Sequence, residues 1–242
     1  MSGRKVCLCK KEEGAMGILL TLAAYGVIVI FLGVSFSRFL ILWRAERTVR
    51  RFAPPGSRLT PLLVLKMVGD VFFLTRLLKT NDLLWLGEWL FHCSFVLVAL
   101  QHLRFVLNPV PEWVRLLQPF GLVAGYLLPL SLLYILFMKI GREKGYFPSY
   151  NFFLLLLLFL IAVTGLLMRT VFRADTVAIK GFVTGIFSFT PVNSPDGIPF
   201  IIHFALALLL VAFLPSHIFA APFVIMEARK REEELRMILH EK

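Results

Sequence analysis

Four histidines lie within strongly apolar stretches of the sequence. His92 and His102 bound the stretch HCSFVLVALQH, and His203 and His217 bound HFALALLLVAFLPSH, whereas a fifth, His240, belongs to a charged C-terminal tail. An ionisable side chain inside a membrane helix is costly, and is a functional candidate for that reason. Neutral imidazole is also the commonest protein ligand of metal ions. The four residues therefore indicate either metal ligands or hydrogen-bonded packing histidines.

Helical periodicity places the two histidines of each stretch on one side of a helix. Ten residues at about 100° each leave His92 and His102 about 80° apart, and fourteen residues leave His203 and His217 about 40° apart. Along the helix axis, at about 1.5 Å per residue, these partners are roughly 15 Å and 21 Å apart. One tetrahedral metal ion, with ligands at about 2 Å, cannot reach all four imidazoles. The spacing favours two separate sites of two histidines each.

The histidines belong to two of five apolar runs. The chain has 242 residues, 58% of them hydrophobic. That excess is concentrated in runs of about 20 or more residues, the length that a helix needs to cross a bilayer. Backbone polar groups in a bilayer must be satisfied within their own segment, which favours helices. We predict an all-α integral membrane protein, a five-transmembrane-helix bundle. The predicted spans are 17–43, 83–107, 120–139, 151–172 and 198–226.

The second and fifth spans carry all four histidines, and they run antiparallel because an odd number of crossings separates them. The first histidine of one helix is then level with the second of the other, which gives the pairs His102–His203 and His92–His217. A ligand that accepts one imidazole on each face, and is apolar enough for a bilayer, is haem, which a helical bundle can hold between facing helices. We predict two b haems per chain, with the four histidines as axial iron ligands. Two axial histidines favour electron transfer over chemistry at the metal.

The charge distribution predicts the orientation of the bundle. Of the 26 Lys and Arg residues, nine lie on the side of the N-terminus and seventeen on the opposite side. Because cytoplasmic loops carry the excess of positive charge, we expect the N-terminus outside and the C-terminus in the cytoplasm, in the inner (cytoplasmic) membrane of the cell. The net charge of +11 is then explained by the basic loops on the cytoplasmic side. The sequence contains no basic patch interleaved with aromatic residues, so nucleic-acid binding is not indicated.

The same pattern divides the chain into three parts. We expect residues 1–16 to form an outer polar tail, 17–226 the membrane cytochrome domain, and 227–242 a charged helical tail in the cytoplasm. Within the membrane domain, residues 61–79 alternate apolar stretches with charged side chains, which predicts a helix lying in the membrane interface.

Three arginines are candidates for binding the haem carboxylates. Arg104 follows His102 by two residues, and Arg169 and Arg173 end the fourth span on the same predicted side. Haem propionates are anionic, and arginine pairs with carboxylates through two hydrogen bonds. The alternative is that these arginines only extend to the membrane boundary.

Other chemistry is not indicated by the sequence. The three cysteines form neither CxxC nor CxxCH, so neither a structural zinc site nor a c-type haem attachment is indicated. The chain also lacks a cysteine set for its own iron–sulfur cluster. It has no dinucleotide-binding fingerprint and no catalytic carboxylate pair. We therefore expect an electron-transfer subunit of an oxidoreductase complex rather than a stand-alone enzyme.

The two histidine stretches resemble those of the gamma subunit of respiratory nitrate reductase and related membrane cytochromes b. The relatives include subunits of redox complexes in sulfate reducers and of the heterodisulfide-reductase type. The resemblance covers the five spans and implies an outer N-terminus and haem ligands on the second and fifth helices. It also implies a membrane quinone as substrate and an iron–sulfur partner subunit docked on the cytoplasmic face. The expected function is electron transfer between this quinone/quinol pool and that partner.

The fifth helix departs from the nitrate reductase pattern at one position. In that family a proline follows the first histidine by twelve residues, and the second histidine comes at eighteen. Here Pro215 is twelve residues after His203, but position eighteen is Ala221 and the histidine is His217, at fourteen. This shift of one helical turn points to a relative in another redox complex. It also leaves open a variant with a single haem, at His102 and His203.

A haem-free transporter or membrane anchor is the rival class. Transporters show internal repeats and helices broken by Gly or Pro near the membrane midplane. No internal repeat is found in this sequence, which favours the cytochrome.

Overall fold

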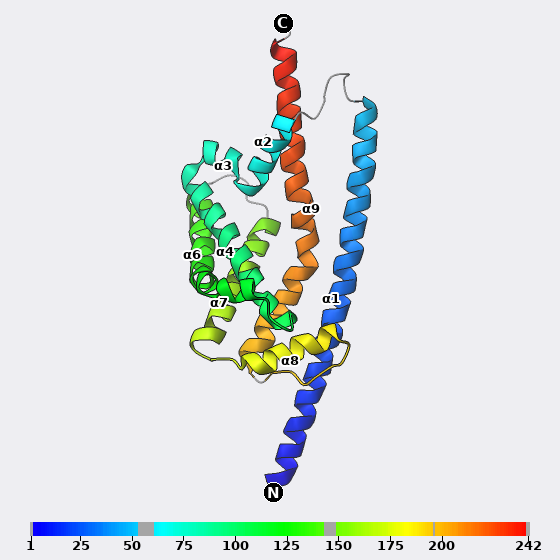
Figure 1. Ribbon diagram of the computed structural model, residues 1–242, viewed down its shortest axis with the longest axis vertical. Coiled ribbons are helices and arrows are strands. Elements are labelled where there is room, and N and C mark those ends of the chain that lie inside the picture. Colours follow the sequence, from blue (N-terminus) through cyan, green and yellow to red (C-terminus); the bar gives the residue numbers. More distant parts are fainter. Residues whose placement is uncertain (1, 53–60, 143–148, 196, 241–242) are drawn as a thin grey trace. The chain divides into compact units, whose positions relative to one another are not determined.

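The computed structural model describes residues 2–52, 61–142, 149–195 and 197–240, which form helices joined by turns (Figure 1). No strand occurs in these ranges. Among the described residues, five helices are long and apolar enough to cross a membrane, which confirms the all-helical class and points to a multi-pass membrane protein. These spans are Ala15–Arg44, Asp82–Val106, Gln118–Gly141, Ser149–Thr170 and Ile198–Pro215.

Two of the five spans belong to much longer helices. α1 runs from Ser2 to Phe52 and α9 from Ile198 to His240, whereas α4 (Asp82–Val106), α6 (Gln118–Arg142) and α7 (Ser149–Thr170) have about the length of one crossing. At about 1.5 Å per residue, both α1 and α9 exceed the roughly 30 Å of a hydrocarbon core. The boundaries predicted at residues 16 and 227 therefore fall inside continuous helices. The thiols of Cys7 and Cys9 lie outside the described side chains.

Shorter helices occupy the connections. Residues 61–79, predicted as one helix, form α2 (Pro61–Phe72) and α3 (Thr75–Thr80), separated at Leu74 by its left-handed backbone (φ 50°). The Trp85 indole donates a hydrogen bond of 2.8 Å to the Phe73 carbonyl beside this break. The interfacial position of the segment stays a prediction.

Two further short helices were not predicted. α5 (Glu112–Leu116) lies between α4 and α6, and α8 (Thr176–Phe187) lies between α7 and α9. Asp175 caps α8, because its carboxylate accepts hydrogen bonds from the backbone N–H groups of Val177 and Ala178.

The chain groups into two compact units. One comprises Met1–Ile28 and Gly87–Leu210, and the other comprises Val29–Leu86 and Val211–Lys242. In the first unit, α6 and α7 pack against each other, with Leu132 and Ala162 in a shared apolar cluster. A second cluster joins α1, α7, α8 and α9. Its buried members are Leu20, Ala24, Met168, Ile179, Phe182, Ile186 and Phe200.

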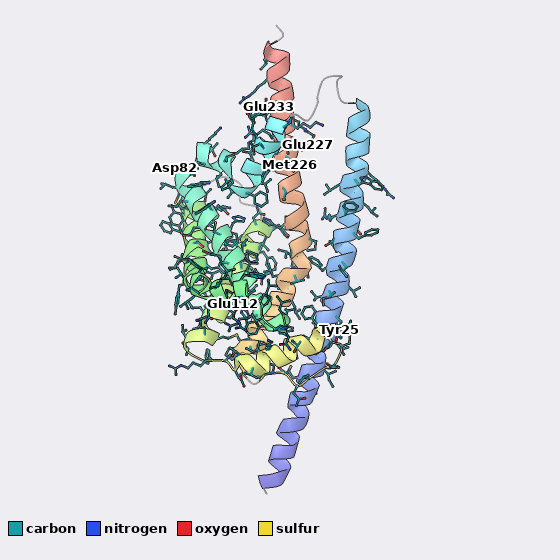
Figure 2. All side chains as sticks on the ribbon, in the orientation of Figure 1. Tyr25, Asp82, Glu112, Met226, Glu227 and Glu233 are labelled. Carbon is teal, nitrogen blue, oxygen red and sulfur yellow. The ribbon has the colours of Figure 1, made fainter. Side chains whose placement is uncertain are left out.

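A hydrogen bond and a close backbone contact fix α1 within the first unit. The Tyr25 hydroxyl donates to the Ile186 carbonyl at 2.9 Å, and Figure 2 shows Tyr25 on α1 beside α8. At Gly17, an added Cβ would lie 2.7 Å from the Ser194 nitrogen and 2.8 Å from the Val192 oxygen. Glycine is thus required where the helix meets the backbone of residues 192–194.

We expect Gly17→Ala to destabilise the first unit by about 1–3 kcal/mol, the usual cost of overpacking a tight contact. The clash is with backbone atoms, so a rotamer change cannot relieve it. Gly33→Ala is the matched control on α1, because nothing lies within 4 Å of a Cβ at that position. Unfolding of purified protein in detergent measures both. Equal stabilities of the two variants would contradict the prediction.

The second unit is held together by a buried ion pair between α2 and α9. Arg229 donates to both carboxylate oxygens of Asp70, from Nε at 2.6 Å and from Nη2 at 2.8 Å, and Thr75 donates a further hydrogen bond to the same carboxylate. Burial raises the pKa of Asp70, but the hydrogen bonds from Arg229 and Thr75 outweigh it and hold the pKa below its ordinary value. Nearer the surface, Lys66 of α2 pairs with Glu233 of α9 at 2.8 Å.

Candidate functional site

His102 and His203 lie close together within the first unit. His102 projects from α4 and His203 from α9, and their ring centroids are 6.4 Å apart with ring planes inclined by 18°. The pair predicted from helical periodicity and antiparallel packing is therefore brought together by the fold. Ligation of iron by these two rings stays a prediction.

Hydrogen bonds at Nδ1 orient three of the four membrane histidines. His102 donates to the Val98 carbonyl at 2.7 Å, and His92 donates to the Glu88 carbonyl at 2.6 Å, each one turn back along α4. A carbonyl only accepts, so the proton of each neutral ring is on Nδ1 and the lone pair is on Nε2. Metal-binding histidines use this arrangement, in which the second nitrogen is held by a backbone carbonyl or a carboxylate.

His203 is oriented by a different helix. Its Nδ1 lies 3.0 Å from Oγ1 of Thr164 on α7. The Thr164 hydroxyl has its own acceptors, the carbonyls of Leu160 at 2.8 Å and Ile161 at 3.0 Å. With that proton on either carbonyl, the hydroxyl oxygen can accept the Nδ1 proton of His203, an arrangement that leaves the lone pair of this ring on Nε2. The hydrogen bonds described for His92 and His102 engage Nδ1.

The separation of the two rings fits ligation of one metal ion from opposite sides. Two imidazole nitrogens each about 2 Å from a metal are about 4 Å apart, and each centroid lies roughly 1 Å behind its nitrogen, which gives about 6 Å between centroids. The observed 6.4 Å between centroids is close to this separation. The donor set also fits iron in a porphyrin, because two neutral imidazoles are the usual axial ligands of an electron-transfer haem. The residues present therefore fit the predicted group.

Aromatic side chains flank the pair, although His102 itself is exposed. Phe105 meets the His102 ring edge-on at 6.0 Å between centroids, and Phe204 follows His203 and stacks on Phe200. Phe105 and Phe204 also pack against the apolar cluster that includes α8. Such walls suit a large apolar ring system.

Two of the three candidate arginines lie in the last turns of α4 and α7. Arg104 and Arg169 are close enough for their like charges to interact, and the Arg104 guanidinium lies 4.8 Å from the centroid of the Phe105 ring. Two neighbouring cations favour an anion between them. Arg173 is exposed and lies after the end of α7, in the left-handed region with φ 45°. Binding of haem carboxylates by these arginines stays a prediction.

His92 and His217 belong to different units. His92 is half-buried on α4 of the first unit, against the Phe91 ring, whereas His217 is on the part of α9 in the second unit. Glu88, whose carbonyl accepts from His92, also pairs its carboxylate with Lys139 of α6 at 3.0 Å. The pair His92–His217 stays a prediction. In the described part of the chain, no three His, Cys, Asp or Glu side chains gather to hold a metal ion.

Two residues of this site were not anticipated from the sequence. Thr164 holds His203, and Gly165 lies directly beneath the same ring, where an added Cβ would be 3.0 Å from its Cε1 atom. The only signal in the sequence is a polar threonine followed by glycine within the long apolar run of the fourth span. Such a pair is common enough in membrane helices to carry no function by itself.

Comparison with known proteins identifies relatives of one kind. The chain is 30% identical over 180 residues to the "Hdr-like menaquinol oxidoreductase cytochrome b-like subunit" of Archaeoglobus fulgidus, covering 62% of this chain and 54% of that protein. It is 30% identical over 150 residues to the protein of the same name from Archaeoglobus profundus, covering 54% and 44%. The chain is thus similar in sequence to two proteins named cytochrome b-like subunits. The predicted resemblance to a membrane cytochrome b is thereby confirmed.

The sequence similarity to these relatives covers only part of their length. The chain spans about half the length of the curated cytochrome b-like relatives that it matches. No family model matches the chain, and no solved structure matches it significantly.

Proposed function

We propose that the chain is the dihaem cytochrome b membrane-anchor subunit of a respiratory oxidoreductase complex. It passes electrons between a membrane quinone/quinol pool and an iron–sulfur partner subunit. The observation that carries the proposal is the His102–His203 pair, with centroids 6.4 Å apart and both Nδ1 atoms hydrogen-bonded. The relatives support the quinol, because their names describe menaquinol oxidoreductase subunits.

The residues of the chain have distinct roles in this proposal. His102 and His203 hold the outer haem, and His92 and His217 hold the second, on the cytoplasmic side. Haem b supplies reversible one-electron transfer when bound. Arg104 and Arg169, with Arg173 nearby in sequence, pair with the haem carboxylates. Phe105 and Phe204 flank the first pair with apolar surface.

Orientation and partners complete the proposal. The excess of Lys and Arg on the side of the C-terminus supports an orientation with the C-terminus in the cytoplasm, across the inner (cytoplasmic) membrane. The iron–sulfur subunit docks on that side and the quinone site lies near the outer haem. The chain lacks a cysteine set for a cluster of its own, so the electrons need such a partner.

The test is the haem content of purified protein, measured as the pyridine haemochrome. We expect two haems b per chain, reduced when menaquinol is added to the oxidised protein. One haem per chain identifies the single-haem variant. A folded but colourless preparation, from cells supplied with porphyrin and iron, contradicts the proposal and favours the haem-free transporter or anchor.

A further inference from the structure

The candidate haem ligand on α9 is oriented by two residues of α7. We propose that Thr164 and Gly165 are positioning residues for His203, which fix its tautomer and its approach to the iron and thereby set the redox potential of the outer haem. This inference rests on the proposed function, because it assumes that His203 binds haem.

The Thr164 hydroxyl determines which nitrogen of His203 faces the site. Its proton is donated to carbonyls of its own helix, Leu160 at 2.8 Å and Ile161 at 3.0 Å. Its oxygen at 3.0 Å from Nδ1 can then only accept, which keeps Nε2 deprotonated and available for a metal. His102 and His92 achieve the same state with a carbonyl of their own helix. Of these three rings, His203 is the one whose Nδ1 contacts a side-chain hydroxyl, in addition to the Ile161 carbonyl.

Gly165 determines how closely α7 approaches the imidazole. A Cβ at this position would lie 3.0 Å from Cε1, 3.6 Å from Nδ1 and 3.9 Å from Nε2 of His203. The backbone of α7 at Gly165 therefore limits where the His203 ring can lie. A methyl group there forces the imidazole to move by a few tenths of an ångström, because the contact is with a packed ring.

The acceptor at Nδ1 also affects the electronic properties of the ligand. A hydrogen bond from Nδ1 raises the basicity of the imidazole, and a more basic ligand favours the oxidised metal. Removal of the Thr164 oxygen therefore raises the potential of the haem bound by His203. The Ile161 carbonyl, which His203 also reaches, remains in such a variant and limits the effect. We expect about a tenfold change in the equilibrium between the two oxidation states, which is about 59 mV for one electron.

The first experiment compares threonine variants of the haem-loaded full chain by redox titration of the haem absorbance. Thr164→Val is expected to raise the midpoint potential of one haem by the amount that corresponds to about a tenfold change in its oxidation equilibrium. Thr164→Ser keeps the hydroxyl and is expected to have the wild-type potential. Thr170→Val is the matched control, because Thr170 makes the same hydroxyl bond to a carbonyl four residues back, on the same helix. An unchanged potential in Thr164→Val overturns the role of Thr164. If the valine variant does not accumulate, Thr164→Ala removes the same hydroxyl.

The second experiment replaces the glycine. Gly165→Ala is expected to alter the electron paramagnetic resonance spectrum of one oxidised haem and to lower its occupancy. Gly125→Ala on α6, where nothing lies within 4 Å of a Cβ, is expected to match the wild type. A wild-type spectrum and full occupancy in Gly165→Ala overturn the role of Gly165. Colourless wild-type protein instead overturns the proposed function itself, so the two failures are distinguishable.

Discussion

Replacement of His203 by alanine is expected to remove one of two haems from the purified chain. Alanine supplies no ligand in place of an imidazole whose Nδ1 is held by Thr164 and whose ring lies 6.4 Å from that of His102. His102→Ala is expected to remove the same haem, because we propose that both rings bind one iron atom. The pyridine haemochrome measures the content, and the potential of the remaining haem shows which one was lost. His240→Ala, in the charged tail, is the histidine control and should keep both haems.

The same series tests the pairing across the two spans. His92→Ala and His217→Ala are each expected to remove the haem on the cytoplasmic side. The potential of the outer haem is expected to stay unchanged in both variants. If His92→Ala and His203→Ala remove the same haem, the pairing is wrong, although the cytochrome assignment stands. If His217→Ala keeps both haems while the other three variants each lose one, another residue serves in place of His217.

Breaking the Asp70–Arg229 pair is expected to destabilise the second unit by about 3–5 kcal/mol, because one charge is left buried without its partner. Arg229→Met removes both hydrogen bonds from the carboxylate. Chemical unfolding of the protein in detergent measures the loss. Arg231→Met is the matched control on α9, because its pair with Glu227 is exposed and such pairs contribute at most about 1 kcal/mol. Equal losses in the two variants would contradict the prediction.

A double variant separates the buried charge from the contact itself. Asp70→Leu together with Arg229→Met replaces the pair by apolar side chains of similar size, a change that is often neutral or stabilising. We expect the double variant to recover most of the stability lost in Arg229→Met. A double variant as unstable as the single one would show that the precise geometry of the pair is needed.

The pair also gives the second unit a defined dependence on pH. The pKa of Asp70 is lower in the folded protein than the value of about 3.9 in an unfolded chain. The contribution of the ionised Asp70 to the stability of the second unit is therefore fully present above about pH 4. It is lost as the pH falls through the pKa of Asp70 in the folded protein. Asp70→Asn is expected to remove this part of the acid-induced loss of stability. Unfolding measured from pH 7 down to pH 3 compares the two proteins.

The features that sequence could predict are those set by short periodic patterns. Five spans follow from the length of the apolar runs, and the faces of His92 and His102 follow from 3.6 residues per turn. The pairing of His102 with His203 follows from two antiparallel helices that carry these residues at the same depth. The described residues include five helices long and apolar enough to span a membrane, and the fold brings His102 and His203 together. A bilayer restricts a chain to few alternatives, which makes such features predictable.

The features that sequence could not predict arise from contacts between helices. Nothing local indicates that Thr164 meets a histidine 39 positions away, or that Asp70 pairs with Arg229, 159 positions away. The break at Leu74 was missed because a left-handed backbone is unusual for leucine. The helix α8 was not predicted, because its twelve residues are too few to span a membrane and the length of apolar runs was the signal used for helices.

The different supports of His102 and His203 have a consequence for how such a protein can evolve. The Val98 acceptor belongs to the peptide backbone, so no substitution at that position deletes the bond to His102. The Thr164 acceptor is a side chain, and one codon change abolishes or restores it. Selection can therefore adjust the imidazole on α9 by small mutational steps while its counterpart on α4 keeps a constant support.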